Sequence, residues 1–572
     1  MGLVGRPAAA VPGRAAQGRA HPAAGPGRGQ LLRPRRHPLI RSRPTAAPRR
    51  ARLPGLVVLI VLLRPSIGPA EDRHAEAVSH DHTGVALGDS GRLEAAEAEF
   101  REAIRLDPRF ADAHFHLGLA LERSGQARAA VDEYEQAVFR APDMLEARYG
   151  LASACAAVGD LDGAIRLLRP IVEAAPRFAE ARYNLGVDLW NRYKRASGLR
   201  DKSDLEEAAH QLEAASRLEP AEAKVHFALG QLQAERQSLA EAVASLEKAL
   251  ALVPGDPQYA YNLGLALRLQ GDLDAAEARF RQTLERDPRH ALARRALGLL
   301  LRQKGDLAGA AAELRLSAGE LPAEAQSHHL LGGALLKLDD LLQAIEELRQ
   351  ATRLDPLLTE ARVNLAQALL RAGRKDEAEA EQAEVQRVNA EKAGLGRAMV
   401  LLENAAAQVK NGQRASALEQ LREAVRLSPD FPEAHYQLGL ALAEAHETAA
   451  EAEAAFVEAL KLDPANAPAR YWFGRLLLAR GDTASAVFQL RKAVEAAPSL
   501  VEAHRELARI ALQSRDWDAA ATELRALLAW DSADAQAHRD LATVLGARGD
   551  ADEAARERAA GRRLEETRKT PR

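Results

Sequence analysis

Prolines recur along this chain at nearly constant intervals, and this regularity constrains the fold more than any other feature of the sequence. Most neighbours among positions 108, 142, 176, 220, 254, 288, 322, 356, 429, 464 and 498 are 34 residues apart. The surrounding segments repeat as well: "AEAEFREAIRLDPRF" (96–110) corresponds to "AEARFRQTLERDPRH" (276–290). Such a period indicates an array of one small supersecondary unit, because independent globular domains do not repeat at so short a spacing.

Within a unit, the apolar residues follow helical spacing. In residues 111–144, a first helix is expected up to Gly125, which suits a left-handed helix end, and Gly118 is expected to let a second helix approach closely. Pro142 stops the second helix. One stripe of that helix has spacings of four and three residues (Ala130, Tyr134, Ala137). Each unit is thus predicted to be a helical hairpin that buries its apolar face by stacking on its neighbours.

This combination of period, small residues and terminal proline resembles the tetratricopeptide repeat (TPR) family. With the proline at position 32, fourteen units begin at residues 77, 111, 145, 179, 223, 257, 291, 325, 359, 398, 432, 467, 501 and 535. The resemblance implies an all-α fold, an α-solenoid coiled as a right-handed superhelix with a long concave groove. It also implies that positions two, five, six, nine and twelve of each first helix face that groove.

Composition supports helices and argues against a nucleic-acid partner. Aromatic residues make up 4% of the chain, and no alternating strand pattern occurs. The net charge is −3, yet residues 1–70 hold 13 arginines and no Asp, Glu or Lys, so residues 71–572 carry −16. An acidic array lacks the basic stripe that nucleic-acid binding requires. The single cysteine, Cys155, excludes an internal disulfide and a cysteine-based zinc site.

The first seventy residues differ from the rest of the chain. Residues 1–52 are rich in Arg, Pro and Ala and are expected to be disordered. The apolar run Leu53–Leu63 is short for a membrane span, which needs about 20 residues, but it fits the apolar region of an export signal. The small residues Gly68 and Ala70 fit a cleavage site. Residues 53–70 therefore favour a periplasmic or membrane-tethered protein of a bacterial envelope; without a signal there, the protein would be cytoplasmic.

Two departures from the period divide the array. The interval from Pro176 to Pro220 is ten residues too long, and the excess falls in the aromatic, basic stretch 190–204. This stretch is interpreted as a lengthened hairpin tip, with a partner contact as the alternative. After unit nine, Ala390 replaces the proline, 376–392 is predicted as one long helix, and 393–397 form a junction. The expected arrays are units one to nine (77–392) and ten to fourteen (398–565), followed by a tail (566–572).

No catalytic motif is present, so we expect no enzyme and no cofactor. Nucleophile elbows, phosphate loops and His-Glu-x-x-His are absent from the sequence. Histidines occupy position four of seven units and are expected to pack between helices, with a ring nitrogen reaching solvent or a carbonyl. His114 and His116 point about 200° apart on a helix, so they cannot easily chelate one ion. A weak metal site across units, from His82 and His116, is a remaining alternative.

The predicted groove carries an aromatic ladder with several amides. Position five or six of the first helices holds the candidate binding residues Phe115, His116, Tyr149, Tyr183, Asn184, Phe227, Tyr261, Asn262, Asn364, Tyr436 and Tyr471. An Asn amide both donates to and accepts from an extended peptide, and tyrosines supply amphipathic contact area. The stretch "EARYNLG" (180–186) resembles the repeats of protein O-GlcNAc transferase, although the catalytic domain of that enzyme has no counterpart here. Alternatively, the aromatic rings simply fill the superhelix interior.

These features predict a scaffold or assembly factor that binds protein or peptide partners in the groove. The alternative is a substrate-recruiting subunit of a separate enzyme, such as a glycosyltransferase.

Overall fold

A computed structural model describes residues 69–195, 202–443 and 448–569. This part of the chain contains 27 α-helices and no β-strand. The predicted all-α solenoid is therefore confirmed. None of the helices in these three segments has the length and apolarity needed to cross a membrane. The predicted leader (1–52) and residues 53–68 of the predicted signal-like segment (53–70) lie outside the described residues, whereas Pro69 and Ala70 are the first two residues of α1.

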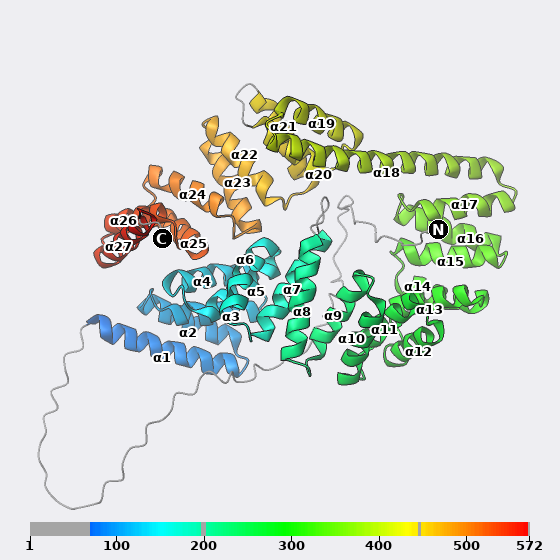
Figure 1. Cartoon of the computed structure of the whole chain (residues 1–572), viewed down its shortest axis with the longest axis horizontal. Helices are drawn as coiled ribbons and strands as arrows, with labels where there is room; N and C mark the ends of the chain where they lie inside the picture. Colours follow the sequence, from blue (N-terminus) through cyan, green and yellow to red (C-terminus); the bar gives the residue numbers. More distant parts are fainter. Residues whose placement is uncertain (1–68, 196–201, 444–447, 570–572) are drawn as a thin grey trace, which may run out of the picture. The chain divides into compact units, whose positions relative to one another are not determined.

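The helices follow one another as consecutive pairs (Figure 1). The first seventeen are α1 Pro69–Asp89, α2 Leu93–Leu106, α3 Ala111–Arg123, α4 Ala127–Arg140, α5 Leu145–Val158, α6 Leu161–Ala174, α7 Ala179–Arg195, α8 Lys202–Leu218, α9 Ala223–Glu235, α10 Leu239–Leu252, α11 Pro257–Gln270, α12 Leu273–Arg286, α13 Ala291–Lys304, α14 Leu307–Glu320, α15 Ala325–Lys337, α16 Leu341–Leu354 and α17 Thr359–Arg371.

A long helix follows, and then nine shorter ones. These are α18 Lys375–Lys410, α19 Arg414–Leu427, α20 Pro432–Leu442, α21 Ala449–Leu462, α22 Ala467–Ala479, α23 Thr483–Ala496, α24 Val501–Ser514, α25 Trp517–Trp530, α26 Ala535–Arg548 and α27 Ala551–Lys569.

The two helices of a pair approach closely at a glycine, as the sequence predicts. A Cβ placed on Gly118 of α3 would lie 2.7 Å from a ring carbon of Tyr134 on α4. Tyr134 is fully buried, and its hydroxyl donates to the Glu122 carboxylate at 2.9 Å. The glycine therefore makes room for a large ring at the centre of the hairpin, where real Cβ atoms would overlap it.

A left-handed residue separates the first and second helices of most pairs. Nine glycines have positive φ angles, among them Gly125 at +80°. Three units carry another residue there: Gln237, Asp339 and Arg515, with φ of 58–64°. The left-handed region costs an L-residue about 1–2 kcal/mol, so these three turns are strained by comparison with the glycine turns.

Helix α18 joins the second helix of unit nine to the first helix of unit ten, in place of the turn that the period would put between these units. Residues 393–397, expected as a junction, lie inside this helix, which runs on to Lys410. Ala390 stands where most other units have the helix-stopping proline, and the helix continues through it. Gly394 is buried, and a Cβ there would lie 2.7 Å from the carbonyl oxygen of Leu427, at the end of α19. The packing of α19 thus requires a small residue at this point of α18.

The insertion after Pro176 lengthens both helices of unit four. Helix α7 has 17 residues and α8 also has 17, whereas α3 has 13 and α4 has 14. Arg192, in the added turn, donates two hydrogen bonds to Asp204 at 2.6 and 2.8 Å and one to Asp162 at 2.8 Å. Residues 196–201, between the two helices, lie outside the described part of the chain.

Helices far apart in the sequence also pack together, since α4 contacts α25. Asp160 and Ser499, both buried, meet in the same region: Asp160 accepts from the Ser499 backbone N–H at 2.8 Å and from its hydroxyl at 3.1 Å. Trp530 donates its indole N–H to the buried Glu135 carboxylate at 2.8 Å. These bonds join units two and three to units twelve and thirteen.

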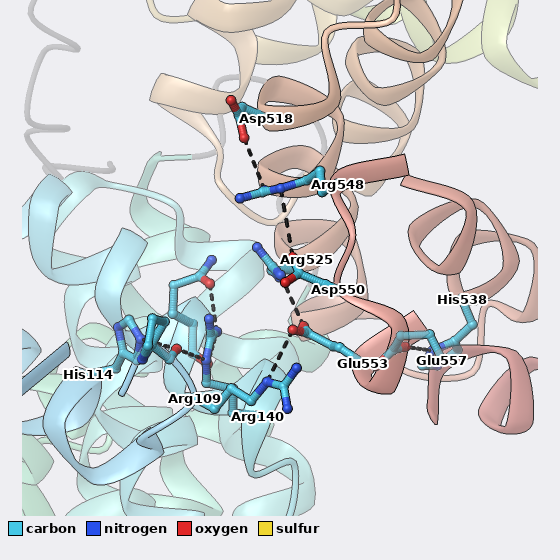
Figure 2. Close-up of polar contacts among 12 residues, drawn as sticks. Arg109, His114, Arg140, Asp518, Arg525, His538, Arg548, Asp550, Glu553 and Glu557 are labelled. Atoms are coloured by element: carbon cyan, nitrogen blue, oxygen red, sulfur yellow. Dashed lines mark hydrogen bonds and ion pairs between the residues drawn. The ribbon is translucent and has the colours of Figure 1, made fainter. Parts of the chain in front are cut away.

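Ion pairs border this contact. Figure 2 shows Glu553 of α27 between two arginines; its carboxylate lies 3.3 Å from Arg109 Nε and 3.0 Å from Arg525.

Burial raises the pKa of Glu135 to about 7, while His504 and the Trp530 bond oppose that rise. Glu135 is therefore a buried carboxylate within the contact between the early and late units.

Candidate protein-interaction surface

Position four of the units holds a repeated polar contact between helices. In four units, a histidine lies between a glutamate 19 residues later and a backbone carbonyl six residues earlier; the four are His114, His328, His504 and His538. Arg294 and Arg362 make equivalent contacts in their own units. The expectation that a ring nitrogen reaches a carbonyl is confirmed. We call this pair of contacts, from position four to the later glutamate and to the earlier carbonyl, the position-four clasp.

At two of these clasps the imidazole favours its protonated form. The Nδ1 of His504 lies 2.7 Å from Glu523 and its Nε2 lies 3.1 Å from the Pro498 carbonyl. Each bond needs an N–H, so both ring nitrogens must donate. Although burial opposes it, hydrogen bonding to Glu523 raises the pKa of His504, and the Glu557 bond does the same for His538.

The histidines near the chain's start do not converge as metal ligands. His116 bonds to the buried carboxylate of Asp81 at 2.8 Å, and its ring lies 5.7 Å from that of Phe100. Among the described residues, no group of three or more His, Cys, Asp or Glu side chains could hold a metal ion. The cross-unit pairing of His116 is therefore with an aspartate that the sequence pattern had not singled out.

The structure brings two candidate groove residues, Tyr149 and Asn184, into contact across adjacent first helices. Asn184 on α7 donates its side-chain amide to the Tyr149 hydroxyl on α5 at 2.8 Å. Tyr183 on α7 faces Lys224 on α9, whose ammonium lies 5.4 Å from the ring centroid. Both tyrosines are half-buried, and burial raises the pKa of each hydroxyl. These neutral hydroxyls and the amide form a mixed aromatic and polar surface.

Other candidate residues pack on rings that the ladder does not include. Phe227 lies 4.7 Å from Tyr259, ring to ring, and Tyr261 lies 5.0 Å from the His290 ring. Tyr261 is only 8% exposed, so it serves the core more than the surface. Phe115 is half-buried against Tyr134 at 6.0 Å, as a member of the core around α3 and α4. This burial agrees with the alternative given in the sequence analysis, in which the aromatic rings fill the interior of the array.

The remaining candidates are dispersed along the array. Asn262 donates to the Gln258 carbonyl at 2.8 Å and accepts from Gln231 at 3.1 Å, so its amide is engaged within the chain. Tyr436 is half-buried in the core formed with α20 and α21. Tyr471 contacts Trp472 edge to face at 5.4 Å, with Arg475 nearby.

A cluster of polar donors in units seven to nine was missed at the sequence level. Arg302 on α13, His329 on α15 and Asn364 on α17 lie on three consecutive first helices. Asn364 was predicted as a groove residue, but the arginine and the histidine were not. The sequence did contain a pattern that could have indicated this cluster, because Arg268 and Arg302 are the basic residues at position twelve and lie in two successive units.

Comparison with known proteins agrees with this architecture. Models described as "Tetratricopeptide repeat" match residues 193–257, 261–325 and 329–391, and also 121–185, 445–510 and 477–545. A further model described as "TPR repeat" matches 84–125 and 407–445. Together these matches span most of the chain from residue 84 to residue 545. A search of curated proteins finds no match.

Several solved structures are similar to parts of the chain. The thermophilic TPR protein TTC0263 of Thermus thermophilus is 29% identical, with 33% of this chain and 98% of that chain covered and a TM-score of 0.28. MamA of Desulfovibrio magneticus is 26% identical, with 29% and 94% covered and a TM-score of 0.28. YrrB, described as a TPR protein with an unusual peptide-binding site, is 23% identical, with 35% and 95% covered and a TM-score of 0.29. By its repeats and by these family matches, the chain belongs to the tetratricopeptide repeat family.

Proposed function

We propose that this protein is a non-enzymatic scaffold that binds protein or peptide partners along the first-helix face of its repeats. The repeats themselves support a general role in protein interaction. The observation that carries the more specific proposal is the hydrogen bond from Asn184 to Tyr149 on adjacent first helices, with Tyr183 next to Asn184 in the sequence and all three side chains half-buried.

This surface has the chemistry that extended peptides need. A half-buried tyrosine presents a large apolar area and one polar tip at little entropic cost. The Asn184 amide bonds Tyr149 with one of its donors, which leaves its carbonyl oxygen and its second N–H for a peptide backbone. Binding through backbone groups and flat rings is tolerant of sequence, which suits a scaffold with several partners.

Affinity capture with variant surfaces tests the proposal. The wild-type chain and the double variant Tyr183→Ala with Asn184→Ala would be used as bait, and partners would be quantified by mass spectrometry. Leu316→Ala serves as the control, because Leu316 is 50% exposed on α14, a second helix, and lies outside the proposed surface. The proposal is supported if the double variant loses partners that the wild type and Leu316→Ala both retain. Equal capture by all three baits would refute the assignment of this surface.

The capture also separates the two functional classes. A partner set without a common enzyme supports a scaffold or assembly factor. One stably bound enzyme, such as a glycosyltransferase, whose activity on its substrate depends on this chain, would instead identify a substrate-recruiting subunit.

We propose export to the bacterial envelope as the location of this function. The support is the apolar run Leu53–Leu63 with the small residues Gly68 and Ala70 after it. Fractionation of cells that express the full chain, beside a variant with Leu59→Arg, tests this directly. Envelope localisation that the charged variant loses is expected, and a cytoplasmic wild-type chain would contradict export.

A further inference from the structure

Glu135 is buried by helices that lie far from it in the sequence. It occupies position 25 of unit two, on the second helix α4, and is only 4% exposed. In other units the same position holds a charged side chain that is exposed to solvent, as at Glu247, Arg281, Arg315, Arg422 and Arg491. Position 25 thus faces outward within a hairpin, and Glu135 loses its water because α25 packs on α4.

Apolar side chains surround this carboxylate on both sides of the contact. Ala529 and Trp530, at the end of α25, pack into the hydrophobic cluster of α2 to α5. Phe139 on α4 packs in turn against the cluster formed by α24 to α27. In the described part of the chain, the Trp530 indole N–H is the one hydrogen-bond donor to Glu135, and no Arg or Lys forms an ion pair with it. A carboxylate so placed has little to offset the loss of its hydration.

Two charged groups of the late units lie near Glu135. His504 on α24 favours the ionised carboxylate. It gives no hydrogen bond to that carboxylate, because its Nδ1 lies 2.7 Å from Glu523 of α25 and its Nε2 lies 3.1 Å from the Pro498 carbonyl. An anion as close as Glu523 balances much of the charge of the imidazolium ring.

The early units add groups of both signs. Arg128 on α4 favours ionisation of Glu135, and Asp132 on the same helix opposes it. Arg128 lies 3.4 Å from Asp132 and donates to the Val494 carbonyl at 2.8 Å. On α5, Cys155 is buried, and burial raises the pKa of its thiol and keeps it neutral. Desolvation is therefore the strongest influence, and it raises the pKa of Glu135 from an ordinary 4.5 to about 7.

We propose that the contact between the early and late units is a proton-dependent latch, closed when Glu135 is protonated and opened when Glu135 ionises. In an open array Glu135 returns to solvent, as Glu247 does in unit five, and its pKa returns to about 4.5. Closing then takes up a proton between these two pKa values, so the latch is strongest below pH 4.5 and weakens as pH rises to about 7. Each pH unit in this window lowers the ratio of closed to open molecules by up to about tenfold.

Single-molecule FRET across the contact measures how often the latch is closed. Asp143→Cys and Ala533→Cys place a donor and an acceptor dye on exposed residues, one between α4 and α5 and the other between α25 and α26. The native Cys155 is buried and stays unlabelled in the folded chain. The closed fraction should fall as pH rises from about 5 to about 7, and it should change little above that.

Glu135→Gln separates the latch from other effects of pH. The glutamine oxygen still accepts from Trp530, but the side chain has no proton to lose. This variant should stay closed as pH rises, and near pH 8 it should be closed more often than the wild type. Glu247→Gln removes a carboxyl from the same position of unit five, where it is exposed, so it should behave as the wild type does.

The same comparisons are repeated in an Asp160→Ala background. This change removes the bonds to Ser499, so it brings open molecules into range if the intact contact is too stable for opening to be counted. Two results would overturn the inference. One is a closed fraction that is independent of pH in both backgrounds, and the other is a pH dependence that Glu135→Gln retains in full.

Discussion

Replacing Asp160 by Ala should open the contact between the early and late units. The Asp160 carboxylate caps α6 by accepting from the Gly163 N–H at 2.9 Å, and it also accepts from the Ser499 N–H at 2.8 Å and the Ser499 hydroxyl at 3.1 Å. Loss of a helix cap costs about 1 kcal/mol. A buried N–H left without an acceptor costs about 1–3 kcal/mol more. The variant should therefore lose roughly 2–4 kcal/mol.

Asp272→Ala is the matched control for this change. Asp272 caps α12 in the same way, accepting from the Ala275 N–H at 3.0 Å, but it has no hydrogen bond to a distant unit within the described part of the chain. It should lose about 1 kcal/mol. The difference between the two variants, about 1–3 kcal/mol, then measures the bonds to Ser499 alone.

Amide hydrogen exchange is the suitable assay, because repeat arrays open locally and seldom unfold as one unit. Exchange at residues 497–503 should quicken about tenfold for every 1.4 kcal/mol lost in Asp160→Ala. Gly163→Ala should act similarly, since its Cβ would lie 2.8 Å from the Ser499 Cβ. If exchange at these residues is the same in Asp160→Ala and Asp272→Ala, the contact does not hold the two parts of the array together.

Three further predictions concern single units. Gln237→Gly should stabilise its unit by up to about 1–2 kcal/mol, because Gln237 has a φ of +64°; urea melts of the two chains compare them, and a lower midpoint would contradict the strain. Gly118→Ala should destabilise by about 1–3 kcal/mol, because its Cβ would overlap the Tyr134 ring; an unchanged exchange rate in α3 and α4 would contradict this close packing. The His538 clasp should weaken as pH rises, since its folded-state pKa is raised above 6.5 by the Glu557 bond. Its stabilisation is complete below pH 6.5 and is lost as pH passes the folded value, so exchange in α26 should depend on pH there in the wild type but not in His538→Gln.

The hairpins could be predicted from the sequence because their determinants are local. Gly118 and Tyr134 are 16 residues apart, within one period, so the spacing alone places them opposite one another. The position-four clasp is equally local, since a histidine, a glutamate 19 residues later and a backbone carbonyl six residues earlier recur at fixed offsets. The loss of the proline at Ala390 likewise indicated a long helix, although the helix extends through 393–397 to Lys410.

Other features depend on how units stack, which no short-range pattern specifies. Asp160 and Ser499 are 339 residues apart, and small rotations summed over many repeats decide whether they meet. The donor cluster of Arg302, His329 and Asn364 has a similar cause, because Arg302 and Asn364 have different positions in their units. Only the packing of three first helices brings their nitrogens to the same space, beside Gly333. The aromatic residues at position five were the clearer sequence pattern for a binding surface. The burial of Tyr261 nevertheless shows that a ring at this position can pack in the core.

The most direct test of the account is site-specific photo-crosslinking within a captured complex. A benzoylphenylalanine would replace Tyr183 on the first helix of unit four, and in a second chain it would replace Leu316 on a second helix. If partners bind the first-helix face, the crosslinker at position 183 captures the partner and the crosslinker at position 316 does not. Efficient capture from position 316, with none from position 183, would contradict the central claim.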